Sequence, residues 1–107
     1  MIKKLVVAIL ICSGSIQANA QDKNFIWSMS IEDLKQGNFH GAITYLNEYL
    51  KMVPTEPGAY FNRGMAKFNL GDIQGACEDF SHADGVNVKS SEEMIEAICD
   101  KNFKYKF

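Results

Sequence analysis

A chain of 107 residues has the length of a single domain, and with 47% hydrophobic and 22% charged residues its composition is that of an ordinary folded protein. A net charge of -2 lacks the basic excess on which nucleic-acid binding depends, so we predict no nucleic-acid partner.

The first twenty residues have the layout of a secretory signal peptide. Lys3 and Lys4 precede an apolar run over residues 5–12, and the Ala-Asn-Ala sequence at 18–20 matches a small-residue cleavage site. The run is shorter than the about 20 residues of a membrane-spanning helix. We therefore expect cleavage after Ala20, a mature chain with a net charge of -4, and export to the periplasm or the cell exterior. Retention of the segment as a tether is the alternative.

Residues 59–83 contain two short amphipathic segments on either side of Leu70-Gly71-Asp72. Apolar side chains recur at helical spacing in both segments: Tyr60, Phe61, Met65, Phe68, Ile73, Ala76, Cys77, Phe80 and Ala83. Glycine can adopt the left-handed conformation that ends a helix, and an aspartate next to it can accept the free amide hydrogens that begin the next one. This stretch therefore predicts a helix hairpin.

A similar hairpin is predicted before it, with helices over residues 24–36 and 40–52. Between them, Gly37 is expected to end the first helix and Asn38 to begin the second, as Gly71 and Asp72 do in the later hairpin. Pro54 and Pro57 then bracket a turn, because the residue before a proline is pushed out of helical geometry while proline itself suits a first helical turn.

A fifth helix is predicted over residues 90–101. Ser90 and Ser91 precede two glutamates, and a serine cap followed by acids favours a helix start. We expect this helix to cover the flank that the last hairpin leaves open.

The pattern of residues 59–83 resembles the tetratricopeptide repeat, a helix-turn-helix unit of about 34 residues. The residues that match the small, aromatic and turn positions of the family are Tyr60, Gly64, Leu70, Gly71, Asp72, Ala76, Asp79, Phe80 and Ala83. A shift by one repeat length gives a second copy, which pairs Gly37 with Gly71, Gly41 with Gly75, Ala42 with Ala76, Ser30 with Gly64, Leu46 with Phe80 and Phe39 with Ile73. The departures from the family pattern are Asp33, Tyr49, Lys67 and Val88.

The resemblance implies an all-α fold in which antiparallel helix hairpins stack as a short right-handed solenoid. Within residues 21–89 we expect two hairpins, at about 23–56 and 57–90, followed by the capping helix 90–101 and a tail at 102–107.

In this family the first helix of each hairpin lines the concave face, where partner peptides usually lie. Steps of one repeat length place six apolar residues in two rows of that face: Trp27, Phe61 and Ile95, then Ile31, Met65 and Cys99. We predict a protein-binding surface made of Trp27, Ile31, Phe61 and Met65, with Asn62 and Asn69 offering hydrogen bonds. The alternative is that these side chains only pack helix against helix.

Some tetratricopeptide domains clamp the C-terminal carboxylate of heat-shock chaperones with lysine, arginine and asparagine side chains. Only Asn62 matches that pattern. Glu92 and Glu96 stand where two of the cations belong and would repel a carboxylate. We therefore predict that the chain does not bind such a terminus.

No catalytic or metal constellation accompanies these features, so we predict no enzyme, no metal and no cofactor. His40 and His82 are far apart in sequence, and each is expected alone on an outward face.

The repeat phase places Cys77 and Cys99 on different faces, so we expect two buried thiols, with a disulfide as the alternative in an oxidising compartment.

The sequence thus predicts a non-catalytic interaction module of the cell envelope whose partner is another protein or a peptide. The alternative is a structural subunit that associates with itself as a homodimer or within a larger complex.

The ending 101–107 alternates lysine with aromatic residues. It fits cations at a helix end, a strand-like tail that inserts into something, or a surface-binding tag, with a frayed tail as the default.

Overall fold

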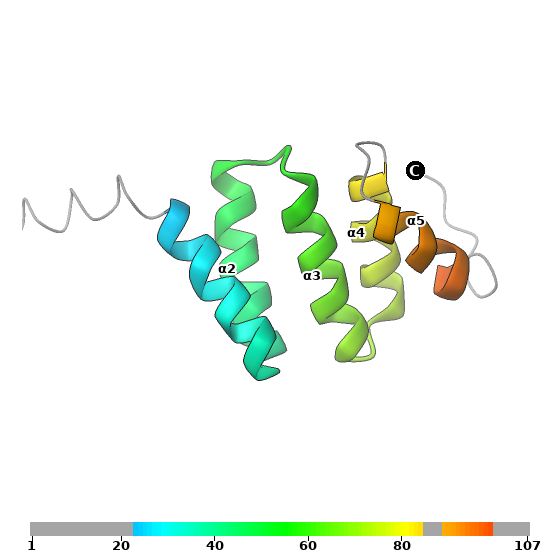
Figure 1. The fold of residues 1–107 in the computed structure, drawn as a ribbon, viewed down its shortest axis with the longest axis horizontal. Helices are drawn as coiled ribbons and strands as arrows, with labels where there is room; N and C mark the ends of the chain where they lie inside the picture. The colour runs from blue at the N-terminus through cyan, green and yellow to red at the C-terminus, as the bar shows by residue number, and fades with distance from the viewer. Residues whose placement is uncertain (1–22, 85–88, 100–107) are drawn as a thin grey trace, which may run out of the picture.

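The computed structural model describes residues 23–84 and 89–99, and every regular element within these ranges is a helix. Residues 23–36 form the first helix, followed by α2 (Phe39–Met52), α3 (Pro57–Asn69), α4 (Ile73–Asp84), α5 (Lys89–Met94) and the π-helix η1 (Ile95–Cys99). Successive helices run antiparallel and lie side by side in chain order (Figure 1). The predicted fold class, all-α with stacked helix hairpins, is confirmed.

The turns inside the two hairpins use the same chemistry at equivalent positions of the repeat. Gly37 and Gly71 have φ values of +75° and +87°, which only glycine adopts without strain. The side chains of Asn38 and Asp72 then accept hydrogen bonds from backbone amides three residues on, at 3.3 Å and 3.0 Å. In both hairpins, the structure thus confirms the predicted glycine at the helix end and the predicted capping side chain at the next helix start.

The two prolines bracket the turn between the hairpins as predicted. Pro57 opens α3, where its missing amide hydrogen costs nothing. The Glu56 side chain accepts a hydrogen bond from the Gly58 amide at 3.3 Å, and the Tyr60 hydroxyl donates to the Pro54 carbonyl at 2.8 Å. Side chains at the start of α3 thus fix the turn between α2 and α3.

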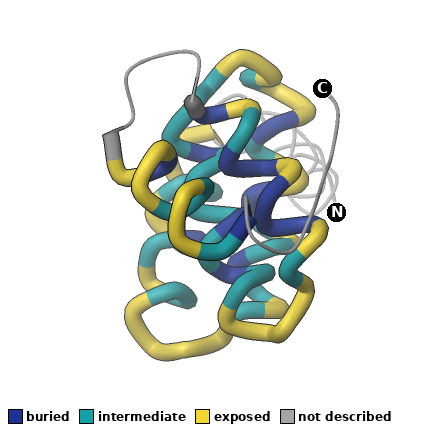
Figure 2. The backbone as a smooth tube through the Cα atoms, turned by 90° about the vertical axis from the view of Figure 1, so that its right-hand side faces the viewer, coloured by how far each residue is buried: buried dark blue, intermediate teal, exposed yellow. Residues whose placement is uncertain are grey.

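Burial follows the repeat register. Leu46 and Phe80, which the repeat places at equivalent positions, are both fully buried, and each belongs to one of two apolar clusters. The buried stretches lie along the middle of the stack, where helices face one another (Figure 2). Gly64 allows the closest approach, since a Cβ added there would lie 2.7 Å from the Phe80 ring.

The last helix differs from the prediction at its start. Helix α5 already begins at Lys89, so neither Ser90 nor Ser91 is the cap. Ser91 is fully buried, and its hydroxyl donates to the Phe80 carbonyl of α4 at 2.9 Å. Its role is therefore to attach α5 to α4.

The preference for two buried thiols was wrong, because Cys77 and Cys99 form a disulfide with a Cα–Cα distance of 5.8 Å. The expectation assumed that the last helix keeps the repeat phase through Cys99. Residues 95–99 are instead π-helical, and this wider winding changes which side chains face α4. Both cysteines are fully buried in the cluster that contains Phe80.

Three sequence predictions lie outside the described residues: the signal peptide at 1–20, the end of the capping helix at 100–101 and the tail at 102–107. Within the described part, no helix is long and apolar enough to cross a membrane.

Replacing Gly64 by alanine tests the close packing of α3 on α4. We expect the free energy of unfolding to fall by about 1 to 3 kcal/mol, since the added methyl meets the Phe80 ring. Gly58→Ala in the same helix is the matched control, because its Cβ would come no closer than 3.2 Å to the flexible Glu56 side chain. Equal stability of the two variants in urea denaturation would contradict this packing.

Candidate binding surface

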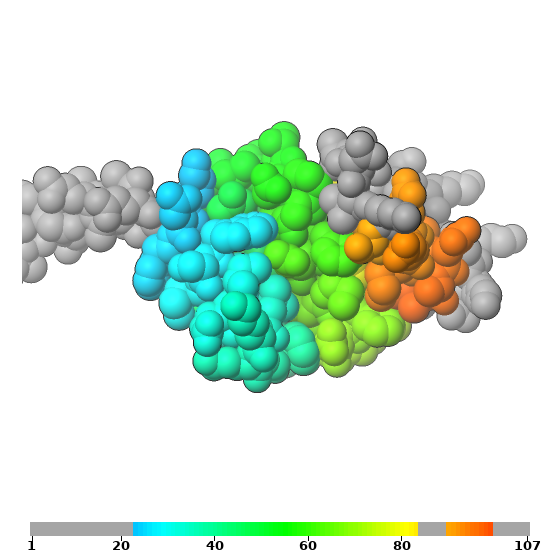
Figure 3. All heavy atoms as spheres, in the orientation of Figure 1, coloured from blue at the N-terminus to red at the C-terminus, as the bar shows by residue number. Residues whose placement is uncertain are grey.

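The predicted binding residues lie on the first helices of the two hairpins. Trp27 and Ile31 belong to the helix of residues 23–36, and Phe61 and Met65 belong to α3. We call these four side chains the apolar stripe; all four are half-buried. Figure 3 shows a face on which the N-terminal helix, α3 and α5 with η1 come to the surface in turn.

The α3 half of the stripe also packs into the core. The ring centroids of Phe61 and Phe80 lie 5.6 Å apart, with an angle of 43° between the rings. Met65 packs against the same cluster, which includes both cysteines of the disulfide. The structure therefore brings Phe61 and Met65 together over one apolar cluster.

Trp27 packs elsewhere. Its ring centroid lies 4.9 Å from that of Tyr49, and it contacts the second cluster, which contains Leu46, Leu50 and Ala59. The stripe is thus supported from beneath by two separate clusters. Trp27, Phe61 and Met65 combine a packing role with partial exposure, so core packing and binding are not exclusive alternatives.

The two asparagines flank the α3 half differently. Asn62 is half-buried, whereas Asn69 is exposed at the end of α3. The Asn69 side-chain amide donates to the Met65 carbonyl at 2.8 Å, which satisfies one of the last carbonyls of the helix.

A charged cluster that the sequence analysis missed lies between α3 and α4. Arg63 donates two hydrogen bonds to the Asp79 carboxylate, at 2.7 Å and 2.9 Å, and a third to the Asn47 side chain at 2.9 Å. The Lys67 ammonium lies 3.1 Å from the same carboxylate, which is 3% exposed. The signal was present in the sequence, since Arg63 and Lys67 are one turn apart and Asp79 lies on the facing helix.

Lys67, which departs from the pattern that the sequence resembles, takes part in this cluster. The buried Asp79 carboxylate is paired with two cations, and the Lys67 ammonium is the second of them. The hydrogen bonds that Arg63 donates to Asp79 raise the pKa of the guanidinium above its ordinary value, and desolvation opposes this only in part. Arg63 therefore stays charged at every pH at which the protein is handled.

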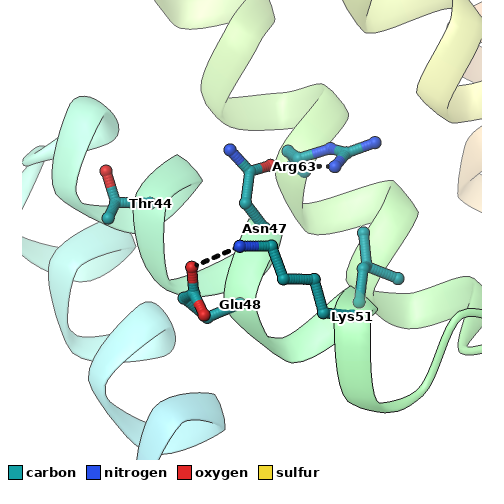
Figure 4. A pocket seen from close by; sticks show the side chains of 6 residues that line it. Thr44, Asn47, Glu48, Lys51 and Arg63 are labelled. Carbon is teal, nitrogen blue, oxygen red and sulfur yellow. Dashed lines mark hydrogen bonds and ion pairs between the residues drawn. The ribbon is translucent and has the colours of Figure 1, made fainter.

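An open hollow of about 470 Å³ lies between α2 and α3. It is lined by Thr44, Asn47, Glu48, Leu50, Lys51 and Arg63 (Figure 4). Lys51 reaches Glu48 at 2.9 Å, and Arg63 is committed to Asp79. The charged side chains that line the hollow are therefore paired with one another or with Asp79.

Among the residues that the structure describes, no group of histidine, cysteine, aspartate or glutamate side chains could hold a metal ion. His82 is exposed as expected but not alone, since its ring lies 4.9 Å from that of Tyr60. This stacking gives His82 a structural contact at the end of α4.

Comparison with known proteins finds a distant relative. The chain is 27% identical over 71 residues to tetratricopeptide repeat protein 36 of Danio rerio. The alignment covers 66% of this chain, which spans only 38% of the length of that protein. No family model and no solved structure matches the chain. These findings support a tetratricopeptide-like, all-helical chain.

Asp79→Asn tests the buried charged cluster. The substitution removes the negative charge that two cations share, so we expect the free energy of unfolding to fall by about 3 kcal/mol. The control is Glu48→Gln, which breaks an exposed pair with Lys51 and should cost at most about 0.5 kcal/mol. Similar urea midpoints for the two variants would contradict a structural role for Asp79.

Proposed function

We propose that this chain is a non-catalytic protein-interaction module of the tetratricopeptide type, which acts in the cell envelope or outside the cell. It buries an apolar peptide or helix from a partner protein against the apolar stripe, on the concave face that the first helices of the hairpins line.

The observation that carries this proposal is the partial exposure of all four stripe residues on successive hairpins. Large apolar side chains that remain accessible in a row across neighbouring helices favour docking of an apolar segment. Trp27 is the main anchor, since an indole ring buries a large area and contributes strongly at interfaces.

The two asparagines of the predicted surface orient the bound segment. Asn62 and the Oδ1 of Asn69, whose amide is engaged with the Met65 carbonyl, offer hydrogen bonds to the backbone of the bound segment. An apolar surface alone gives affinity, whereas such polar groups fix the register of the partner.

Two further observations support the proposal. The relative from Danio rerio is by its name a tetratricopeptide repeat protein, and repeat proteins of this class act by binding rather than by catalysis. The Cys77–Cys99 disulfide agrees with an oxidising compartment, as the segment at 1–20 predicts.

The second candidate function is structural. The same half-buried apolar side chains can pair with those of a second copy, and Phe25, which is 59% exposed, adds apolar area on the first helix. A homodimer or a subunit of a larger envelope complex would then be expected.

Site-specific photocrosslinking in cells tests the proposal and separates the two candidates. A photoreactive residue at position 31 should link the full chain to a partner, whereas the same residue at the exposed position 44 of α2 should not. Trp27→Ala should lower the yield from position 31 about tenfold, because a buried large side chain contributes about 1.5 to 3 kcal/mol.

Links to a different protein support the module, and links only to a second copy support the structural subunit. Circular dichroism of each variant controls for unfolding. Absence of any link from position 31, or the same product from positions 31 and 44, would contradict binding at the stripe.

A further inference from the structure

Helices α5 and η1 carry three exposed glutamates, which we call the acidic border. Glu92, Glu93 and Glu96 are all exposed, and after Lys89, the first residue of α5, no basic residue follows up to position 99. Ile95, between these acids, packs against the cluster that also supports Phe61 and Met65. The three carboxylates therefore belong to the segment that packs on the same cluster as Phe61 and Met65.

The nearest cations of α3 do not neutralise this border. Arg63 and Lys67 are both bound to Asp79, within the core between α3 and α4. The border therefore favours a ligand that brings its own positive charge. Its position is fixed, because the Ser91 hydrogen bond and the disulfide both hold the segment on α4.

The chain itself contains a segment with the complementary chemistry. Residues 101–107 lie outside the described residues and read Lys-Asn-Phe-Lys-Tyr-Lys-Phe, with three lysines, three aromatic residues and no acid. Its lysines and aromatic residues alternate, so cationic and apolar side chains follow one another along the whole segment.

The segment is long enough to reach the stripe. Eight residues follow Cys99, and an extended chain of that length spans up to roughly 26 to 29 Å. Ile95 of η1 packs on the same cluster as Phe61 and Met65 of α3, and packed helices lie about 8 to 10 Å apart, so these two residues are within that reach. Because the segment is tethered, its effective concentration is in the millimolar range, and weak contacts suffice.

We propose that residues 101–107 dock back on the apolar stripe of the same chain. The aromatic side chains cover Phe61 and Met65, and the lysines lie against Glu92 and Glu96. This inference rests on the proposed function, since the docked segment competes with a partner for the stripe and so regulates its access.

Zero-length carbodiimide crosslinking of the full chain tests the docking, because it joins only lysines and carboxylates in direct contact. We expect links from Lys104 or Lys106 to Glu92 or Glu96 within one chain. Replacement of Phe103, Tyr105 and Phe107 by serine retains every lysine and should lower the yield of these links about tenfold, since it removes the apolar contact. Met52→Ser, an exposed apolar residue at the end of α2, is the matched control and should leave the yield unchanged.

Crosslinks that are absent, or that persist at equal yield in the serine variant, would overturn the docking. A mixture of isotope-labelled and unlabelled chains decides the source of the segment, and links between the two kinds would overturn docking within one chain. If position 31 crosslinks to a partner but carbodiimide gives no lysine–glutamate links, the docking is wrong and the proposed function stands. If carbodiimide gives the lysine–glutamate links but position 31 crosslinks to no partner, the proposed function is wrong and the docking stands.

Discussion

The covalent link between Cys77 and Cys99 is the constraint on which the rest of the structure depends. Residues 89–99 form only a short helical segment, a length that is marginal without tertiary contacts. The disulfide and the buried Ser91 hydroxyl hold this segment on α4, where it closes the cluster around Phe80. Two hairpins alone would leave that flank of the core open, and the face bearing Phe61 and Met65 would lose its border.

The two hairpins could be predicted because their determinants are local. Glycine at 37 and 71 ends a helix through its own backbone freedom, and the following Asn38 and Asp72 begin the next helix with their own side chains. The regular spacing of the repeat then places Leu46 and Phe80 at equivalent buried positions.

The remaining features depend on contacts between distant residues, which no local pattern specifies. The winding of residues 95–99 decides which side of the last helix faces α4, and extrapolating the repeat phase gave the wrong pairing state for Cys99. The charged cluster likewise forms only when α3 meets α4, and Arg63 and Asp79 are 16 residues apart. For the candidate site, the sequence placed the stripe on the first helices, but its support by two separate clusters follows from packing. Stripe residues are therefore part of the fold as well as of the proposed surface.

The most direct test of this account compares the free energy of unfolding of the oxidised chain with that of the Cys77→Ser, Cys99→Ser double variant. The bridged residues are 22 apart, and closing a loop of that size stabilises a fold by about 3 kcal/mol. A loss of that size, with a non-reduced peptide map that links Cys77 to Cys99, is the predicted result. A loss below about 0.5 kcal/mol, within the range of neutral surface changes, or a map that shows two free thiols, would contradict the account.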